Sequence, residues 1–203
     1  DLHQDERGVL EVYHIAWVDG GSRCRLFVDC LQQVKSWSDA TPAHEPIWIW
    51  IEIKDFAGGE RFESLRPVDD AIRAVLGDRL LTPDDVRGGH SSLREALRSR
   101  GWPSLAQARG RILFLLKGDE EQHREYTHGF KHLRGRVMFP AATSAQFGMP
   151  WAAVAKLNSP SSPDIAGARA AGLLVTTTVC VAELDDSECR RARALALASG
   201  AQI

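Results

Sequence analysis

Length, composition and charge place this chain in a broad class. Its 203 residues can form one domain with a sizeable hydrophobic core. Hydrophobic residues make up 44% and charged residues 26%, which is typical of a soluble globular protein and excludes a disordered one. The net charge of −2 offers no basic surface, so no nucleic-acid partner is expected. The longest uninterrupted apolar runs have five residues, far too few to cross a membrane.

The first part of the chain alternates between strand and helix patterns. Residues 9–16 predict a short strand, and residues 27–37 have the apolar spacing of an amphipathic helix. In IWIWIEIKD, residues 47–55, isoleucines alternate strictly with a second set made of two tryptophans, Glu52 and Lys54. Successive side chains of a strand point to opposite faces, so one face of this strand changes from apolar to charged halfway along.

The rest of the chain continues the alternation of helices and strands. Further helices are predicted at 67–76, 92–99, 164–171 and 187–199, the last ending at Gly200. Further strands are predicted at 111–117, 137–140 and 172–176. Residues 80–90, LLTPDDVRGGH, are expected to form a loop between two helices.

Strands that alternate with helices predict a mostly parallel sheet with helical cover, either doubly wound or closed into a barrel. The strand faces favour a barrel. The strand that contains Glu52 and Lys54 presents isoleucines for the helices and tryptophans for the lumen, and the apolar face of residues 111–117 likewise ends at Lys117. Functional groups of such barrels lie at the carboxyl ends of the strands. The chain is therefore predicted to be one α/β domain, residues 1–203, of the TIM-type (β/α) barrel kind.

Five polar residues are expected to meet at the mouth of this barrel. Asp1 and Glu52 would supply carboxylate oxygens, which suit Ca²⁺ or Mg²⁺. Lys54 and Lys117 carry positive charge that suits an anionic phosphate. His14, at the end of the first predicted strand, can transfer a proton near neutral pH. The combination predicts metal-assisted cleavage of a phosphate ester.

These residues also have purely structural interpretations. Glu52 and Lys54 can form an ion pair at a sheet edge. His14 can be a hydrogen-bonded structural histidine, and Lys117 can be a solvated strand end. The remaining histidines lie in polar sequence contexts and are expected at the surface: His44, His90, His123, His128 and His132.

The four cysteines lack the Cys-x-x-Cys spacing of a zinc or thioredoxin-type site. Cys24 with Cys30, and Cys180 with Cys189, are close enough in sequence for local disulfides, and free buried thiols are the alternative. We predict a Cys24–Cys30 disulfide, because this pair flanks a loop-to-helix junction near the expected mouth. A disulfide would indicate a secreted or periplasmic protein.

Several stretches of the chain resemble one enzyme family. DLHQDERGVLEVYH, LLTPDDVRG, LREALRSRGWPSLAQARGRILFLL and ALASGAQI are similar to the bacterial and fungal calcium-dependent phosphoinositide phospholipase C-like family of PLC-like phosphodiesterase TIM barrels. The resemblance covers residue 1 to about residue 160 and resumes at the C-terminal helix. It implies Ca²⁺ as cofactor, phosphatidylinositol or a related phosphodiester as substrate, and transient contact with a membrane surface.

The resemblance also implies roles for individual residues. Asp1 and Glu52 match calcium ligands of the family. His14 matches a catalytic histidine that protonates the leaving alkoxide of diacylglycerol, after the inositol 2-hydroxyl attacks phosphorus to form a cyclic phosphate. Lys117 matches a residue that contacts the substrate phosphate, and geometry alone gives Lys54 a neighbouring role.

The chain also departs from the family pattern. It has no Thr-His-Asn motif for a first catalytic histidine and no Glu before Asp1, residues 175–189 differ from the expected Arg- and Asp-rich stretch, and no Thr-Asp follows SGAQI. The first strand and the C-terminal end of the barrel are therefore expected to be missing. Two alternatives stay open: a metal-dependent glycerophosphodiester phosphodiesterase, and a catalytically degraded barrel that acts as a binding protein.

Overall fold

The computed structural model describes residues 1–14, 22–54, 62–180 and 185–203. Its strands are β1 (Leu2–Gln4), β2 (Leu10–Val12), β3 (Ile47–Glu52), β4 (Ile112–Lys117), β5 (Met138–Ala142), β6 (Val154–Lys156) and β7 (Leu174–Thr176). Its α-helices are α1 (Phe27–Ala40), α2 (Arg66–Leu76), α3 (Pro83–Arg87), α4 (Leu93–Arg100), α5 (Leu105–Ala108), α6 (Glu120–Tyr126), α7 (Asp164–Ala170) and α8 (Asp186–Ser199). Two short 3₁₀ turns are η1 (Gly77–Arg79) and η2 (Ser144–Gln146).

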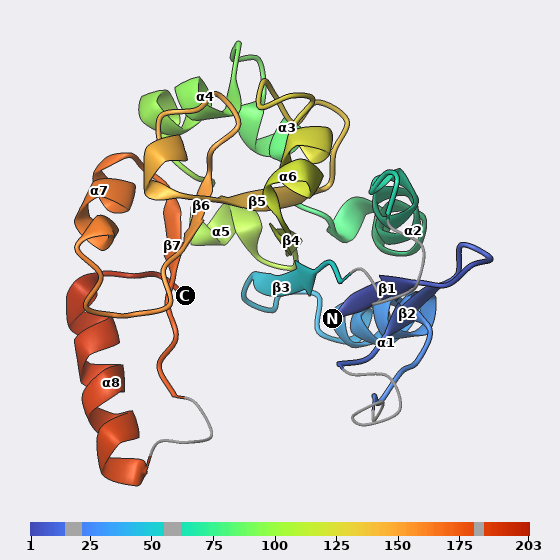
Figure 1. Ribbon diagram of the computed structural model, residues 1–203, viewed down its shortest axis with the longest axis horizontal. Coiled ribbons are helices and arrows are strands. Elements are labelled where there is room, and N and C mark those ends of the chain that lie inside the picture. The colour runs from blue at the N-terminus through green and yellow to red at the C-terminus, as the bar shows by residue number, and fades with distance from the viewer. Residues whose placement is uncertain (15–21, 55–61, 181–184) are drawn as a thin grey trace.

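The central sheet has five parallel strands in the order β3-β4-β5-β6-β7, and the connecting helices lie outside it (Figure 1). The antiparallel β1–β2 pair joins its first edge, where Leu2 bridges Ile53 in parallel and the Lys54 N–H donates to the Leu2 carbonyl at 3.0 Å. At the other edge, the N–H of Ile203 donates to the Val175 carbonyl at 3.1 Å. The sheet is the wall of a TIM-type barrel, as predicted.

The two faces of the sheet carry the two kinds of side chain that the sequence predicts. Ile51 and Ile53 of the outward face are 7% and 5% exposed. Trp50 lies on the lumenal face, because the ammonium of Lys156, three strands away on β6, sits 5.5 Å from its ring centroid. Phe139 is in register with Trp50 through Leu115 of β4, and its ring packs against that of Trp102 with centroids 5.3 Å apart. Apolar side chains therefore fill the lumen of the barrel below a polar rim.

Some local predictions differ from the structure. Of the strand predicted at residues 9–16, the described part up to residue 14 contains β2, Leu10–Val12, and residues 15 and 16 lie outside the described residues. The predicted loop at 80–90 contains α3, which begins with Pro83 and with a capping box between Thr82 and Asp85, so local capping outweighs the glycines that follow. None of the helices in the described part of the chain is long and apolar enough to cross a membrane.

Two of the histidines expected at the surface are buried, so the prediction was wrong for them. His44 is 7% exposed, and its ring nitrogens contact Ser38 Oγ at 2.7 Å and the Glu45 carbonyl at 2.6 Å. His123 is 8% exposed and lies at the edge of the Trp151 ring. Polar neighbours in the sequence concealed both positions, because tertiary packing rather than local pattern buries them.

A buried polar network joins α2, α6 and the start of β5 on the outside of the barrel. Asp69 of α2 is 2% exposed and accepts hydrogen bonds from the Tyr126 hydroxyl and from the Val137 N–H, the latter at 3.2 Å. Arg136 donates to the Tyr126 carbonyl at 3.0 Å and to Glu125 Oε1 at 2.7 Å, and its guanidinium lies 3.5 Å from Asp69 Oδ2. Burial raises the pKa of Asp69 to about 6, although the Tyr126 hydrogen bond and the Arg136 charge both lower it.

We expect Asp69 to make the protein less stable as the pH rises from about 4 to about 6. In this window the folded chain binds the Asp69 proton more tightly than the unfolded chain, whose aspartates titrate near pH 3.9, so raising the pH favours unfolding. The effect is on the order of 2–3 kcal/mol for a shift of about two pKa units. Asp69→Asn cannot titrate and should lack this dependence in urea unfolding followed by circular dichroism. Asp70→Asn, an exposed neighbour on the same helix, should keep it; equal pH slopes for both variants would contradict the assignment.

Candidate functional site

Backbone register places three of the predicted site residues in one row at the barrel mouth. Glu52 and Lys117 are direct partners across β3 and β4. Asp1 precedes Leu2, which bridges Ile53, so Asp1 lies beside Glu52 on the other edge of β3. Asp1 and Glu52 also line the same cavity of about 150 Å³. The parallel strands therefore bring together side chains that are separated by more than a hundred positions in the sequence.

Glu52 is the charge centre of this row. Its Oε1 lies 2.7 Å from the Lys54 ammonium and its Oε2 lies 2.7 Å from the Lys117 ammonium. Burial raises the pKa of Glu52, but the hydrogen bonds from Lys117 and Lys54 outweigh it and hold the pKa at about 2. Glu52 and Lys54 thus form the ion pair that their structural interpretation predicts. Glu52 is a carboxylate at every physiological pH, and it fixes both ammonium groups at the rim.

Lys156, at the end of β6, is a site residue that the sequence reading missed. Its ammonium faces the Trp50 ring across the lumen, and it lies close enough to Lys117 and Glu52 for their charges to act on it. Burial lowers its pKa, the charge of Lys117 lowers it further, and Glu52 partly opposes both. The sequence AAVAK, residues 152–156, again has a strand that ends on a charged residue. Its small alanines conceal the alternation between the two faces of the strand.

Thr176 extends the polar rim to β7. It is the register partner of Lys156, so its side chain points to the same face of the sheet. Thr176 is 4% exposed, and its hydroxyl oxygen is buried without a hydrogen-bond partner in the described residues. An unpaired buried hydroxyl costs free energy, so its presence at a barrel mouth marks a place for a polar ligand group or a water molecule.

His14 follows Tyr13, whose backbone is paired with that of Asp1. Strand β2 ends at Val12, so the predicted alternation does not continue to His14, whose side chain is exposed. Tyr13, the preceding residue, donates its N–H to the Asp1 carbonyl at 3.3 Å. The chain therefore leaves β2 beside Asp1, and the catalytic role of His14 stays a prediction. His3 is instead buried, with its ring stacked 3.8 Å from that of Tyr13.

The carboxylates at the mouth fit calcium in ligand type. Asp1 and Glu52 offer hard oxygen atoms, and the low pKa of Glu52 keeps it ionised for a metal. No group of three or more His, Cys, Asp or Glu side chains that could hold a metal occurs within the described ranges. Calcium takes roughly six to eight oxygens, so these two residues would provide part of the shell and leave positions for water and substrate.

The structure contains both local disulfides, Cys24–Cys30 and Cys180–Cys189, which confirms the predicted first pair. The Cα atoms are 5.3 Å apart in the first and 5.2 Å apart in the second. Cys30, in the first turn of α1, lines the same cavity as Asp1 and Glu52. The Cys24–Cys30 link therefore fixes the chain that leads into one wall of the candidate site.

We expect Glu52→Gln to destabilise the protein above about pH 4.5, because two ammonium groups then face each other without a counter-charge. The cost should be on the order of 1–2 kcal/mol, since both lysines are partly exposed. It should disappear as the pH falls toward 2, where folded Glu52 also becomes protonated. Denaturant unfolding of both proteins at a series of pH values measures this. Glu63→Gln, which removes an exposed carboxylate, is the control, and a Glu52→Gln cost independent of pH would refute the explanation.

Comparisons with known proteins identify the family of the chain. The sequence profile of the family described as phosphoinositide phospholipase C, Ca²⁺-dependent, matches residues 3–203. The structure resembles a Ca²⁺-dependent phosphatidylinositol-specific phospholipase C from Streptomyces antibioticus with a TM-score of 0.77 and 26% identity, covering 99% of this chain and 81% of that one. A search of curated proteins found no match.

A calcium-dependent phosphoinositol-specific phospholipase C from Pseudomonas sp. is also similar, with a TM-score of 0.70 over 95% of this chain and 76% of that one. At 18% identity this likeness shows the shared fold alone. The family match extends through residues 175–189, where the sequence reading saw a departure. It also favours neither a glycerophosphodiester phosphodiesterase nor a binding protein. The chain belongs to the Ca²⁺-dependent phosphoinositide phospholipase C family and is a phosphodiesterase with the barrel fold of that family.

Proposed function

We propose that the row formed by Asp1, Glu52 and Lys117 is the active site of this phospholipase C. We propose also that the enzyme cleaves phosphatidylinositol to diacylglycerol and a cyclic inositol phosphate. The observation that carries the proposal is that Glu52 and Lys117 end adjacent parallel strands, with Lys54 just beyond β3 and Asp1 set beside Glu52 by the bridge from Leu2 to Ile53. This is the end at which barrel enzymes bind and convert their substrates.

Asp1 and Glu52 are the residues that would hold calcium. When bound, calcium supplies Lewis-acid stabilisation of charge on the phosphate and on the attacking hydroxyl. The low pKa of Glu52 means that no proton has to leave this carboxylate before it binds a cation. Asp1 lines the same cavity from the start of β1, so the two carboxylates would coordinate one ion from adjacent segments.

The lysines would position the phosphate and offset its charge. Lys54 and Lys117 are held by Glu52, which restrains two long side chains that would otherwise be mobile. Lys156 adds a third ammonium from the opposite side of the lumen and has no carboxylate within ion-pair distance among the described residues. Thr176 beside it would hydrogen-bond a hydroxyl of the head group.

His14 would act as general acid in the chemical step. As the inositol 2-hydroxyl attacks phosphorus, the bond to the diacylglycerol oxygen breaks, and that oxygen needs a proton. An imidazole can deliver it near neutral pH, and such catalysis is worth on the order of 10²–10⁴ in rate. The position of His14 immediately after Tyr13, whose backbone pairs with Asp1, supports this role.

The two disulfides support export to an oxidising compartment, so the protein would be secreted or periplasmic. A phospholipid substrate requires the barrel mouth to approach a membrane surface. Contact with that surface would be transient, because the substrate head group enters the mouth while its acyl chains stay in the bilayer.

His14→Ala should lower calcium-dependent hydrolysis of phosphatidylinositol by a factor of about 10²–10⁴, because the leaving alkoxide loses its proton donor. Calcium binding, measured by calorimetry, should change little. An inositol phosphodiester with a good leaving group needs less protonation and should recover much of the rate. Equal losses on both substrates would mean that His14 has a structural role. Failure of the unmodified protein to release diacylglycerol with calcium would overturn the proposed activity itself.

Lys156→Met should raise the KM for phosphatidylinositol by roughly tenfold and leave kcat within a few-fold, because it removes one charge-assisted contact with the bound phosphate. Methionine preserves the length of the side chain over Trp50. Lys156→Arg should restore much of the affinity. Lys35→Met, which removes an ammonium paired with Asp39 on α1, is the control and should leave both constants unchanged. A fall in kcat alone would argue against the binding role.

A further inference from the structure

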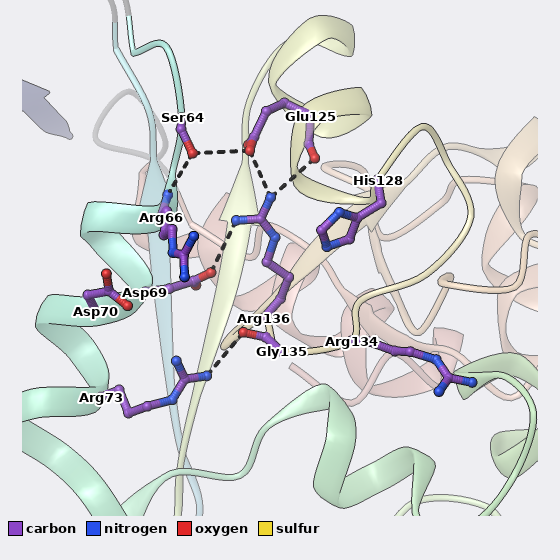
Figure 2. Close-up of a pocket in the computed structure, with 10 residues that line it drawn as sticks. All are labelled: Ser64, Arg66, Asp69, Asp70, Arg73, Glu125, His128, Arg134, Gly135 and Arg136. Atoms are coloured by element: carbon purple, nitrogen blue, oxygen red, sulfur yellow. Dashed lines mark hydrogen bonds and ion pairs between the residues drawn. The ribbon is translucent and has the colours of Figure 1, made fainter.

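The outer wall of the barrel carries a second polar cavity, away from the strand ends that hold Glu52 and Lys117. This groove, of about 460 Å³, lies between α2 and the connection from α6 to β5. Figure 2 shows Arg66 and Arg73 on the α2 side, with His128 and Arg134 across from them. Its size is within the range of small-ligand sites. None of the roles proposed for the barrel mouth uses these residues.

The floor of the groove is a network in which Arg136 contacts two carboxylates. Arg136 donates to Glu125 Oε1 at 2.7 Å and approaches Asp69 Oδ2 at 3.5 Å. Its guanidinium also packs 4.5 Å from the centroid of the Tyr126 ring. Together with Asp70, these two carboxylates set three acidic groups against four arginines in the lining, so a small excess of positive charge remains. Ser64, at the upper end, donates to the same Glu125 Oε1 at 3.2 Å (Figure 2).

The side of the groove formed by α2 carries two guanidinium groups with unused donors. Arg66 and Arg73 are seven positions apart and therefore lie on the same face of the helix. Within the described ranges, no carboxylate lies within ion-pair distance of either one, and Arg73 gives one N–H to the Gly135 carbonyl at 3.2 Å. Asp70 is the remaining carboxylate of the lining. The positive charge of this wall is therefore available to a ligand.

The opposite side of the groove is held in an unusual backbone conformation. His128, Gly129 and Phe130 have successive φ values of 51°, 73° and 63°. Positive φ is uncommon for residues other than glycine and persists only where surrounding contacts fix it. The Phe130 N–H donates to the Thr127 hydroxyl at 2.9 Å, which closes this turn and holds His128 at the edge of the groove.

Two imidazole rings lie next to each other on this side, and that of His128 lines the cavity. The rings of His128 and His132 lie with centroids 4.6 Å apart.

We propose that this groove is a second binding site, separate from the barrel mouth, for an anion that bears a phosphate group. Guanidinium groups match phosphate oxygens in geometry and can bind them through paired N–H donors. Arg66 and Arg73 supply the main contacts, and His128 with the chain at Arg134 and Gly135 lines the other side. The phosphate belongs either to a soluble molecule or to a lipid head group, and the two sources present the same chemistry to the arginines.

Amide NMR titration of the calcium-free protein with inorganic pyrophosphate distinguishes the groove from the mouth. Signals of His128 and Gly135 report on the groove, and the signal of Lys117 reports on the mouth. Arg66→Gln with Arg73→Gln should weaken binding at the groove by roughly tenfold or more, which corresponds to the loss of charged hydrogen bonds, and leave the Lys117 response unchanged. Arg98→Gln with Arg191→Gln, at exposed positions of α4 and α8, removes the same charge and should leave groove binding intact.

Arg66→Gln alone serves if the double variant unfolds, and it should weaken groove binding by several-fold. Co-sedimentation with phosphatidylcholine vesicles, with or without phosphatidic acid, identifies the source of the phosphate. Weaker sedimentation of the groove variant with phosphatidic acid indicates a lipid head group. Unchanged sedimentation together with lost pyrophosphate binding indicates a soluble phosphate. The proposal is overturned if groove signals stay unmoved while the mouth saturates, or if the groove variant and the charge-matched control respond equally.

Discussion

The parallel register between β3 and β4 is the constraint on which the candidate site depends. It sets Glu52 opposite Lys117, and the bridge from Leu2 to Ile53 sets Asp1 on the other flank of Glu52. A slip of one residue would turn all of these side chains to the opposite face, where the helices pack. The isoleucines of β3 prevent such a slip, because it would place their apolar side chains in the lumen and the tryptophans beneath the helices. Burial of the isoleucines on the outer face of β3 thus determines which side chains face the lumen.

Two acidic residues of this protein show how strongly location changes the chemistry of a carboxyl group. Asp69 is enclosed beside one arginine, and burial raises its pKa to about 6. Glu52 is less deeply buried and touches two ammonium groups, which hold its pKa at about 2. The same functional group is therefore partly protonated in the outer wall and fully ionised at the mouth at mildly acidic pH. Only the ionised group is suited to bind a cation.

The barrel and the centre of its mouth were predictable from sequence because they depend on local alternation. The segment of residues 47–55, which contains β3, alternates between the two faces, and β4 repeats this alternation up to Lys117. Lys156 was missed because alanines on β6 give little contrast between faces. The helix α3 carried a readable capping box at Thr82, yet the glycines after it indicated a loop. The groove on the outer wall could not be predicted, since its arginines come from segments more than sixty positions apart and only packing unites them.

The pairing of Glu52 with two lysines has a consequence for the metal-free protein. Adjacent carboxylates that wait for a cation repel one another, and many metal sites in proteins become disordered or swell when the ion is removed. Here Lys54 and Lys117 act as built-in counter-ions that neutralise Glu52 and keep it beside Asp1. The positions of these side chains consequently do not depend on a bound ion. Calcium would bind to a preorganised site. Chelation of calcium should then stop turnover without loosening the barrel.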